Sequence, residues 1–183
     1  EVNCVVENRN ASTKGLLVVI LLALLLSLPW VDRAFYSRGE PREALVAQAM
    51  VSTGNWISPP AYDGAVPSKP PFSHWLISLV SLPQGDVNEA TSRLPSAIAF
   101  VGFCASLYVF LARRLSAQAA LLAPLILVTS SEWFRSASTC RVDTILSVSL
   151  AGALLAPAAL VLGRLRGLVA LGHQQRVEID AAA

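Results

Sequence analysis

Residues 15–31 read GLLVVILLALLLSLPWV, an uncharged run that decides the class of fold. Its length is at the lower limit of the roughly 17–25 residues that a transmembrane helix needs. Trp30 suits the membrane–water interface, where indole rings concentrate. The rival interpretation is a cleaved signal peptide with Lys14 as its basic flank, but no clear small-residue cleavage site follows and further apolar spans do. We therefore interpret 15–31 as a first span or signal anchor, preceded by a polar cytoplasmic segment, 1–14.

The composition of the whole chain also indicates a membrane protein. Hydrophobic residues make up 54% and charged residues 14%, and the mean hydropathy is +0.56. Soluble domains carry about 25% charged residues. The net charge is only +2, and without a dense run of Lys or Arg we expect no nucleic-acid partner. The chain starts at Glu1 without a methionine and ends in three alanines, so we expect it to be a piece of a longer protein.

Three more apolar runs extend the membrane interpretation. They cover 94–112, 117–133 and 142–163, so the sequence predicts an all-α, polytopic transmembrane protein with about four spans. Residues 164–183 form a tail whose pattern fades, and we expect it to be cytoplasmic and truncated or aberrant. The polar stretch 32–93 is too long for a simple connection between two spans.

Basic residues orient the predicted spans. They gather in three groups, Arg9 with Lys14, Arg113 with Arg114, and Arg164 with Arg166. With four spans all three groups lie on one side, which the positive-inside rule makes cytoplasmic. The loop 32–93 and the link 134–141 then face outward together, on the periplasmic or extracellular side of a plasma or inner membrane.

Two short helices are expected inside the outward loop. Residues 44–51 read as an amphipathic helix that Gly54 and Asn55 terminate. Residues 72–82 form an apolar helix that is too short to cross a bilayer and suits the interface.

Four ordered sequence blocks in this loop carry a family pattern. They are GEPREA at 39–44, GNWISP at 54–59, KPPFSHW at 69–75 and RLPS at 93–96. The series resembles the first extracytoplasmic loop of the GT-C membrane glycosyltransferases. The nearest members are the lipid A aminoarabinose transferases and the related enzymes of the dolichyl-phosphate-mannose-protein mannosyltransferase type. The resemblance runs from about residue 29 to 163.

The resemblance implies a GT-C fold, an outward active site and transfer of a sugar from a polyprenyl-phosphate carrier, by inverting single displacement. The acceptor would be lipid A, another glycan or a protein hydroxyl. By itself the present chain would be inactive, since the carrier-binding cavity needs further spans. A non-catalytic membrane protein, either a transporter subunit or a degenerate relative of the family, is the alternative function.

Phosphate as a leaving group calls for a nearby cation, because negative charge develops on it. Lys69 matches the lysine of the family's K-P-P motif, and the two following prolines would hold it stiffly. Arg42 is the second candidate for donor-phosphate binding, although it could instead pair with Glu40 or Glu43 as a structural clamp. Phe72 and Trp75 would line a groove for the prenyl chain, or Trp75 would serve as an interface anchor.

The acceptor hydroxyl must lose a proton, which calls for a carboxylate. Glu40 matches the second acid of the family's acidic pair, but Gly39 stands where the leading Asp is usual, which puts the identity of the base in doubt. Asp143 matches the second acidic site, with Arg141 as its expected partner. The competing interpretation of Asp143 is a helix cap at a positive N-terminus.

Two other polar residues have plain interpretations. His74 fits a hydrogen-bonded surface residue better than an acid, base or metal ligand, and Arg93 fits a cap on the link to the second span. No residue cluster forms a metal site, although a divalent cation could assist the reaction; no other cofactor is expected.

Overall fold

The computed structural model describes residues 2–37, 39–60, 67 and 69–182, and every regular element in these ranges is helical. The all-α prediction is confirmed. The elements, in chain order, are α1 (Val2–Ser27), η1 (Leu28–Trp30), α2 (Gly39–Thr53), α3 (Phe72–Ser81), α4 (Glu89–Ala112), α5 (Ala117–Thr129), α6 (Ser131–Ala137) and α7 (Val142–Ala182).

Three helical stretches of the described chain are long and apolar enough to cross a membrane. They are Ser12–Trp30, Glu89–Ala112 and Val142–Arg164. A fourth span is obtained if α5 and α6, which are bent by 67° at their junction, together form one broken span. The chain is therefore a polytopic helical membrane protein, as predicted.

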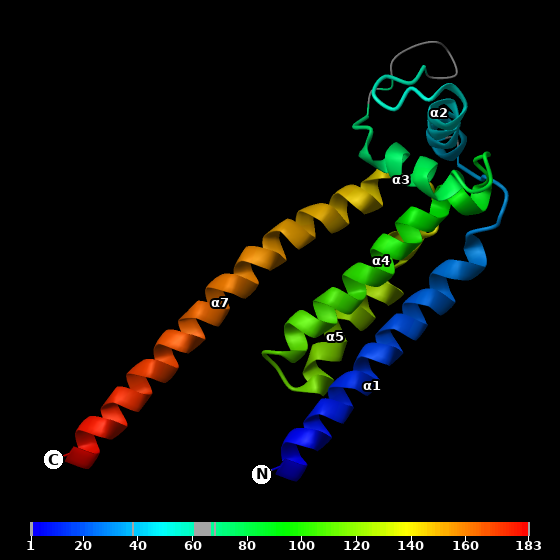
Figure 1. Cartoon of the computed structure of the whole chain (residues 1–183). Coiled ribbons are helices and arrows are strands. Elements are labelled where there is room, and N and C mark those ends of the chain that lie inside the picture. The colour runs from blue at the N-terminus through cyan, green and yellow to red at the C-terminus, as the bar shows by residue number, and fades with distance from the viewer. Residues whose placement is uncertain (1, 38, 61–66, 68, 183) are drawn as a thin grey trace. The chain divides into compact units, whose positions relative to one another are not determined.

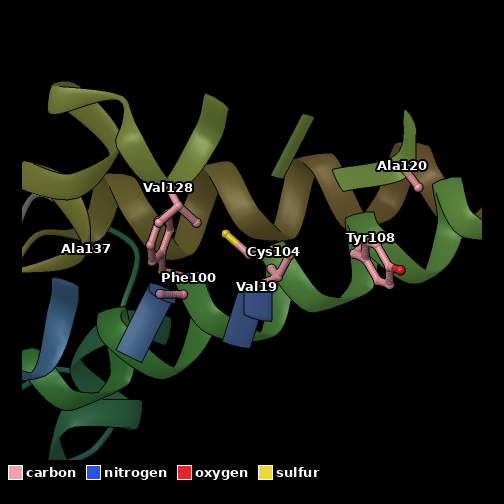
Figure 2. Close-up of a cluster of buried hydrophobic side chains, with 8 residues drawn as sticks. Val19, Phe100, Cys104, Tyr108, Ala120, Val128 and Ala137 are labelled. Atoms are coloured by element: carbon pink, nitrogen blue, oxygen red, sulfur yellow. The ribbon is translucent and has the colours of Figure 1, made fainter. Parts of the chain in front are cut away.

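Helices α1, α4 and α5 pack side by side (Figure 1). Their shared core is a cluster of buried side chains (Figure 2): Val19, Ala23, Phe100, Cys104, Tyr108, Ala120, Val128 and Ala137. Several of these are small, which lets helix backbones approach closely in lipid, where packing rather than water exclusion drives association. At Gly15 the approach leaves no room for a Cβ, because the Tyr108 hydroxyl occupies that space. The same hydroxyl donates a hydrogen bond to the Ser12 carbonyl at 3.0 Å.

Helix α4 starts earlier than the predicted 94–112. Asn88 and Thr91 form a capping box, with Thr91 N–H donating to the Asn88 side chain at 2.8 Å and Asn88 N–H donating to the Thr91 hydroxyl at 3.0 Å. This reciprocal pair satisfies the first free amides and fixes the helix start at Glu89. Pro95 therefore lies inside the helix.

The third apolar run, 117–133, is interrupted, because Ser130 takes an extended conformation between α5 and α6. The fourth run agrees with the candidate span Val142–Arg164, although helix α7 itself continues to Ala182. The chain divides into two compact units, Glu1–Val148 and Ser149–Ala183; the second consists of the rest of α7.

Helices α2 and α3 lie within the segment 32–93, with α2 packed on α3 and α3 packed on α4 (Figure 1). Helix α2 is longer than the predicted 44–51, and it ends where predicted, at Gly54. The φ of Gly54 is 69°, and its N–H bonds the Met50 carbonyl at 3.0 Å. A left-handed residue after the last turn is the usual role of glycine at a helix C-terminus.

Candidate functional site

A buried ion pair joins α2 to α4. Arg93 Nε lies 2.8 Å from Glu40 Oε1, and both side chains are fully buried. The Arg93 guanidinium also donates to the carbonyls of four residues that follow α1: Trp30, Val31, Arg33 and Ala34. Arg93 therefore fixes the exit from α1, rather than merely capping the start of the second span as expected. A planar guanidinium with five donors suits this role.

The Glu40 carboxylate is closed off from any substrate. Besides Arg93, it accepts hydrogen bonds from the backbone N–H of Cys140 at 3.1 Å, Tyr36 at 3.3 Å and Ser37 at 3.4 Å. Burial alone would raise the pKa of Glu40, but the Arg93 hydrogen bond and charge and the backbone donors bring this pKa below its ordinary value. A general base must reach the acceptor hydroxyl, so this geometry does not favour the catalytic role expected of Glu40.

The link between α6 and α7 packs onto the loop helices through Cys140. This residue forms a small apolar cluster with Ala47 of α2 and Ile77 of α3. The pKa of the Cys140 thiol is raised to about 12, mainly by burial. The negative charges of Glu43 and Glu40 also raise this pKa, whereas a hydrogen bond with Ser92 lowers it. The link between α6 and α7 therefore lies close to both carboxylates.

A second cluster forms around Glu43, one helical turn beyond Glu40. Glu43 Oε1 accepts from Lys69 Nζ at 2.7 Å, and Glu43 Oε2 lies 2.7 Å from His74 Nε2. The three residues come from α2, from the segment before α3 and from α3 itself. The side chains of Glu43 and His74 are 7% and 1% exposed, whereas that of Lys69 is 45% exposed.

The charge state of Glu43 follows from these partners. Burial alone would raise its pKa, but the hydrogen bonds of His74 and Lys69 and their charges hold the pKa of Glu43 below its ordinary value. Glu43 is thus an anion enclosed between one buried and one half-exposed partner. His74 Nδ1 finds no hydrogen-bond partner among the described residues.

Asp143 lies at the mouth of a polar hollow. It is in the first turn of α7, 59% exposed, with its Oδ2 3.2 Å from Arg141 Nε. The expected Arg141 partner is therefore found. A cavity of about 290 Å³ opens here, lined by Glu132, Trp133, Ser136, Arg141, Asp143, Thr144 and Ser147. Asp143 is the accessible carboxylate of the two that the sequence singled out.

The remaining candidates are exposed on the loop helices. Arg42 pairs with neither Glu40 nor Glu43, contrary to the clamp interpretation, since Arg93, Lys69 and His74 occupy those carboxylates. Phe72 is 51% exposed and Trp75 is 37% exposed. The Trp75 indole donates to the Trp56 carbonyl at 2.6 Å, which ties the second sequence block to the third.

A mainly apolar hollow lies elsewhere, between the exit from α1 and α6. Its volume is about 760 Å³, and its lining includes Trp30, Tyr36 and Phe134 together with Arg33 and Arg135. In the described part of the chain, no three His, Cys, Asp or Glu residues are grouped so that they could hold a metal ion. Assistance by a divalent metal stays a prediction.

Sequence reasoning missed the importance of Glu43 and misplaced His74. Glu43 lies outside the acidic pair of the family pattern, and His74 was expected at the surface. The only signal for their pairing was an ionisable residue directly before one predicted helix, 44–51, and another inside the second, 72–82. Glu43 and His74 meet because α2 packs on α3, and residue spacing in the sequence does not predict this contact.

Comparison with known proteins gives a family and two relatives. Residues 68–173 match the model of the family described as dolichyl-phosphate-mannose-protein mannosyltransferase. Two curated proteins named undecaprenyl phosphate-alpha-4-amino-4-deoxy-L-arabinose arabinosyl transferase are similar. The one from Shewanella sediminis is 30% identical over 99 residues, 54% of this chain and 18% of that protein. The one from Pectobacterium atrosepticum is 28% identical over 161 residues, 87% of this chain and 29% of that protein.

The chain thus spans less than a third of the length of either relative. No solved structure matches it significantly.

Proposed function

Because this chain belongs to the dolichyl-phosphate-mannose-protein mannosyltransferase family, we propose that the full-length protein is an integral-membrane glycosyltransferase of the GT-C class. It transfers a sugar from a polyprenyl-phosphate carrier to lipid A, another glycan or a protein. The undecaprenyl-phosphate sugar in the names of both relatives supports this class of donor. We place the reaction on the periplasmic or extracellular face of the plasma or inner membrane.

The observation that carries the proposal is the position of Lys69. Its ammonium is half-exposed, and the carboxylate that holds it belongs to the loop region onto which the link before Asp143 packs. A cation at this place stabilises the charge that develops on the departing carrier phosphate. Arg42, exposed on the same helix as Glu43, supplies a second positive charge for the donor.

The acceptor is deprotonated by Asp143, the exposed carboxylate in the polar hollow. Its Arg141 partner, 3.2 Å away, orients the carboxylate. Glu40 instead holds Arg93 and fixes the loop. Phe72 and Trp75 present exposed aromatic surface to the prenyl chain, and the bilayer supplies the surrounding lipid.

Transfer of labelled sugar tests this function. Membranes containing the full-length protein are supplied with a radiolabelled polyprenyl-phosphate sugar pool, and label in lipid, glycan and protein fractions is counted. Lys69→Ala and Asp143→Asn are each expected to lower transfer about 100-fold. Asp86→Asn is the matched control, because Asp86 is exposed and, among the described residues, its carboxylate accepts a hydrogen bond only from the neighbouring Val87 N–H. Wild-type levels of transfer by Lys69→Ala or Asp143→Asn would refute the assigned roles.

One observation favours the alternative, a non-catalytic relative: Gly39 stands where the family has an acid, and Glu40 beside it is buried in an ion pair. A Cβ added at Gly39 meets no atom within 4 Å, so the backbone there has room for the start of a side chain. If wild-type protein transfers no label but Gly39→Asp does, the protein is a relative that has lost its activity through this residue. Transfer by the wild type excludes that alternative.

A further inference from the structure

We propose that Glu43 is a built-in counter-ion that competes with the donor phosphate for Lys69, and that His74 is the positioning residue that lets Lys69 leave. This inference rests on the proposed function, in which Lys69 binds the carrier phosphate. It assigns roles to Glu43 and His74, two residues to which the family resemblance gave no part in catalysis or donor binding.

The two partners of Glu43 differ in how freely they can move. One carboxylate oxygen is bound to Lys69 and the other to His74, each at 2.7 Å. His74 is 1% exposed and held on α3, whereas the Lys69 side chain is 45% exposed on a flexible four-carbon stem. Of the two partners, only Lys69 can turn toward an incoming ligand.

When Lys69 leaves, Glu43 keeps its contact with His74. Loss of the only partner of a buried carboxylate strongly destabilises the folded protein. Glu43, with a side chain only 7% exposed, would face that penalty if Lys69 were its single partner. The hydrogen bond from His74 Nε2 remains when Lys69 moves from the carboxylate to the phosphate, so the buried carboxylate is never left without a hydrogen-bond partner.

The Glu43–Lys69 contact affects binding of the carrier phosphate. In the unliganded protein the carboxylate neutralises the lysine, and the phosphate must displace it. The same competition favours release of the polyprenyl phosphate after transfer, because Glu43 recaptures Lys69. Removing the negative charge at residue 43 must therefore tighten phosphate binding, whereas a merely structural role for Glu43 predicts weaker binding.

The experiment measures binding of undecaprenyl phosphate to the purified full-length protein in detergent by native mass spectrometry. Undecaprenol, which lacks the phosphate, is titrated in parallel, so that the phosphate-dependent part of the affinity is isolated. Glu43→Gln keeps the shape of the side chain and is expected to tighten this part about tenfold, the scale of a partly screened ion pair. Glu89→Gln is the matched control, because Glu89 lies in the first turn of α4 with no side-chain partner among the described residues.

His74 is tested by loss and rescue. With His74→Phe, Glu43 has only Lys69 as a partner and holds it more firmly, so undecaprenyl phosphate binds several-fold more weakly. His74→Gln can still donate to Glu43 and is expected to restore most of the affinity. Adding Glu43→Gln to His74→Phe should reverse the loss.

A second variant guards against misfolding of Glu43→Gln. Glu43→Met combined with His74→Phe removes both buried polar partners together, which is far better tolerated than removing one, and it is also expected to tighten phosphate-dependent binding. If either charge-removing variant binds undecaprenyl phosphate as the wild type does, or more weakly, the counter-ion role is overturned. If Lys69→Ala leaves phosphate-dependent binding unchanged, the donor role of Lys69 in the proposed function fails instead.

Turnover supplies a second readout. Glu43→Gln should bind the polyprenyl-phosphate donor more tightly, which lowers KM for the donor. It should also release the polyprenyl-phosphate product more slowly, which lowers kcat. A fall in kcat with an unchanged or higher KM would contradict the exchange of partners.

Discussion

The bundle of α1, α4 and α5 and the loop region of α2 and α3 are held together by different interactions. The bundle core consists of apolar side chains, many of them small. The loop region has only small apolar clusters and relies on two enclosed carboxylates, Glu40 and Glu43. Apolar packing tolerates lipid on the outside, whereas each buried charge requires a specific partner. The bundle is therefore held by many interchangeable apolar contacts, whereas the fold of the loop region depends on a few specific ion pairs.

Removal of the Arg93 side chain is expected to have the largest effect. Arg93→Ala leaves Glu40 buried and unpaired and frees the four carbonyls that follow α1, which should cost roughly 3–5 kcal/mol. Melting of the detergent-solubilised protein and protease cleavage within residues 32–93 measure this. The control is Arg135→Ala, since the Arg135–Glu132 pair is exposed and should leave melting near the wild-type value. A loop equally resistant to protease in Arg93→Ala would contradict the comparison.

A smaller effect is expected in the bundle. Gly15→Ala places a methyl group where the Tyr108 hydroxyl lies and breaks its bond to Ser12. Overpacking of this kind costs about 1–3 kcal/mol. Adding Tyr108→Phe removes the clashing oxygen and should recover part of the melting temperature. Unlike Arg93→Ala, Gly15→Ala should leave protease cleavage of the 32–93 loop unchanged.

The smallest expected effect concerns pH and separates the two regions chemically. Glu40 and Glu43 have a lower pKa folded than the ordinary 4.5, so the unfolded chain takes up protons first as the solution is acidified. The stabilisation is complete above the unfolded pKa and is lost as pH falls through the folded pKa.

Melting at pH 7 and at pH 4 measures this loss. Glu43→Gln should reduce the difference between the two melting temperatures, because one of the two titrating carboxylates is gone. Gly15→Ala, which alters no titratable group, should keep the wild-type difference. An unchanged difference in Glu43→Gln would mean that Glu43 does not contribute to acid sensitivity.

Much of the fold follows from local sequence alone. Apolar runs of sufficient length must be helical in a membrane, because lipid offers the backbone no hydrogen-bond partner. This explains why runs such as 15–31 and 94–112 correspond to candidate spans. Helix ends depended on local chemistry that was only partly recognised: Gly54 was identified as a stop, whereas the Asn88–Thr91 box was overlooked.

The candidate site was only partly readable. Lys69 and Asp143 were chosen because they match motif positions of the resembling family and carry the cation and carboxylate that the chemistry calls for; their catalytic roles stay predictions. The difference between Glu40 and Glu43 could not be foreseen, since both are glutamates one helical turn apart on the same helix. Their environments differ only through residues distant in sequence, with Arg93 and Cys140 closing around Glu40 and Lys69 and His74 meeting at Glu43.

The sequence by itself determined a helical membrane chain, its principal apolar spans and the resemblance of its first loop to a glycosyltransferase family. Only the tertiary structure decided which carboxylate is locked in a buried ion pair, which one is shared by a lysine and a histidine, and which one is exposed in a polar hollow. The physical reason is range: backbone hydrogen bonding and hydropathy act within one segment, whereas burial and charge pairing depend on segments up to 100 residues apart, as Cys140 and Glu40 are.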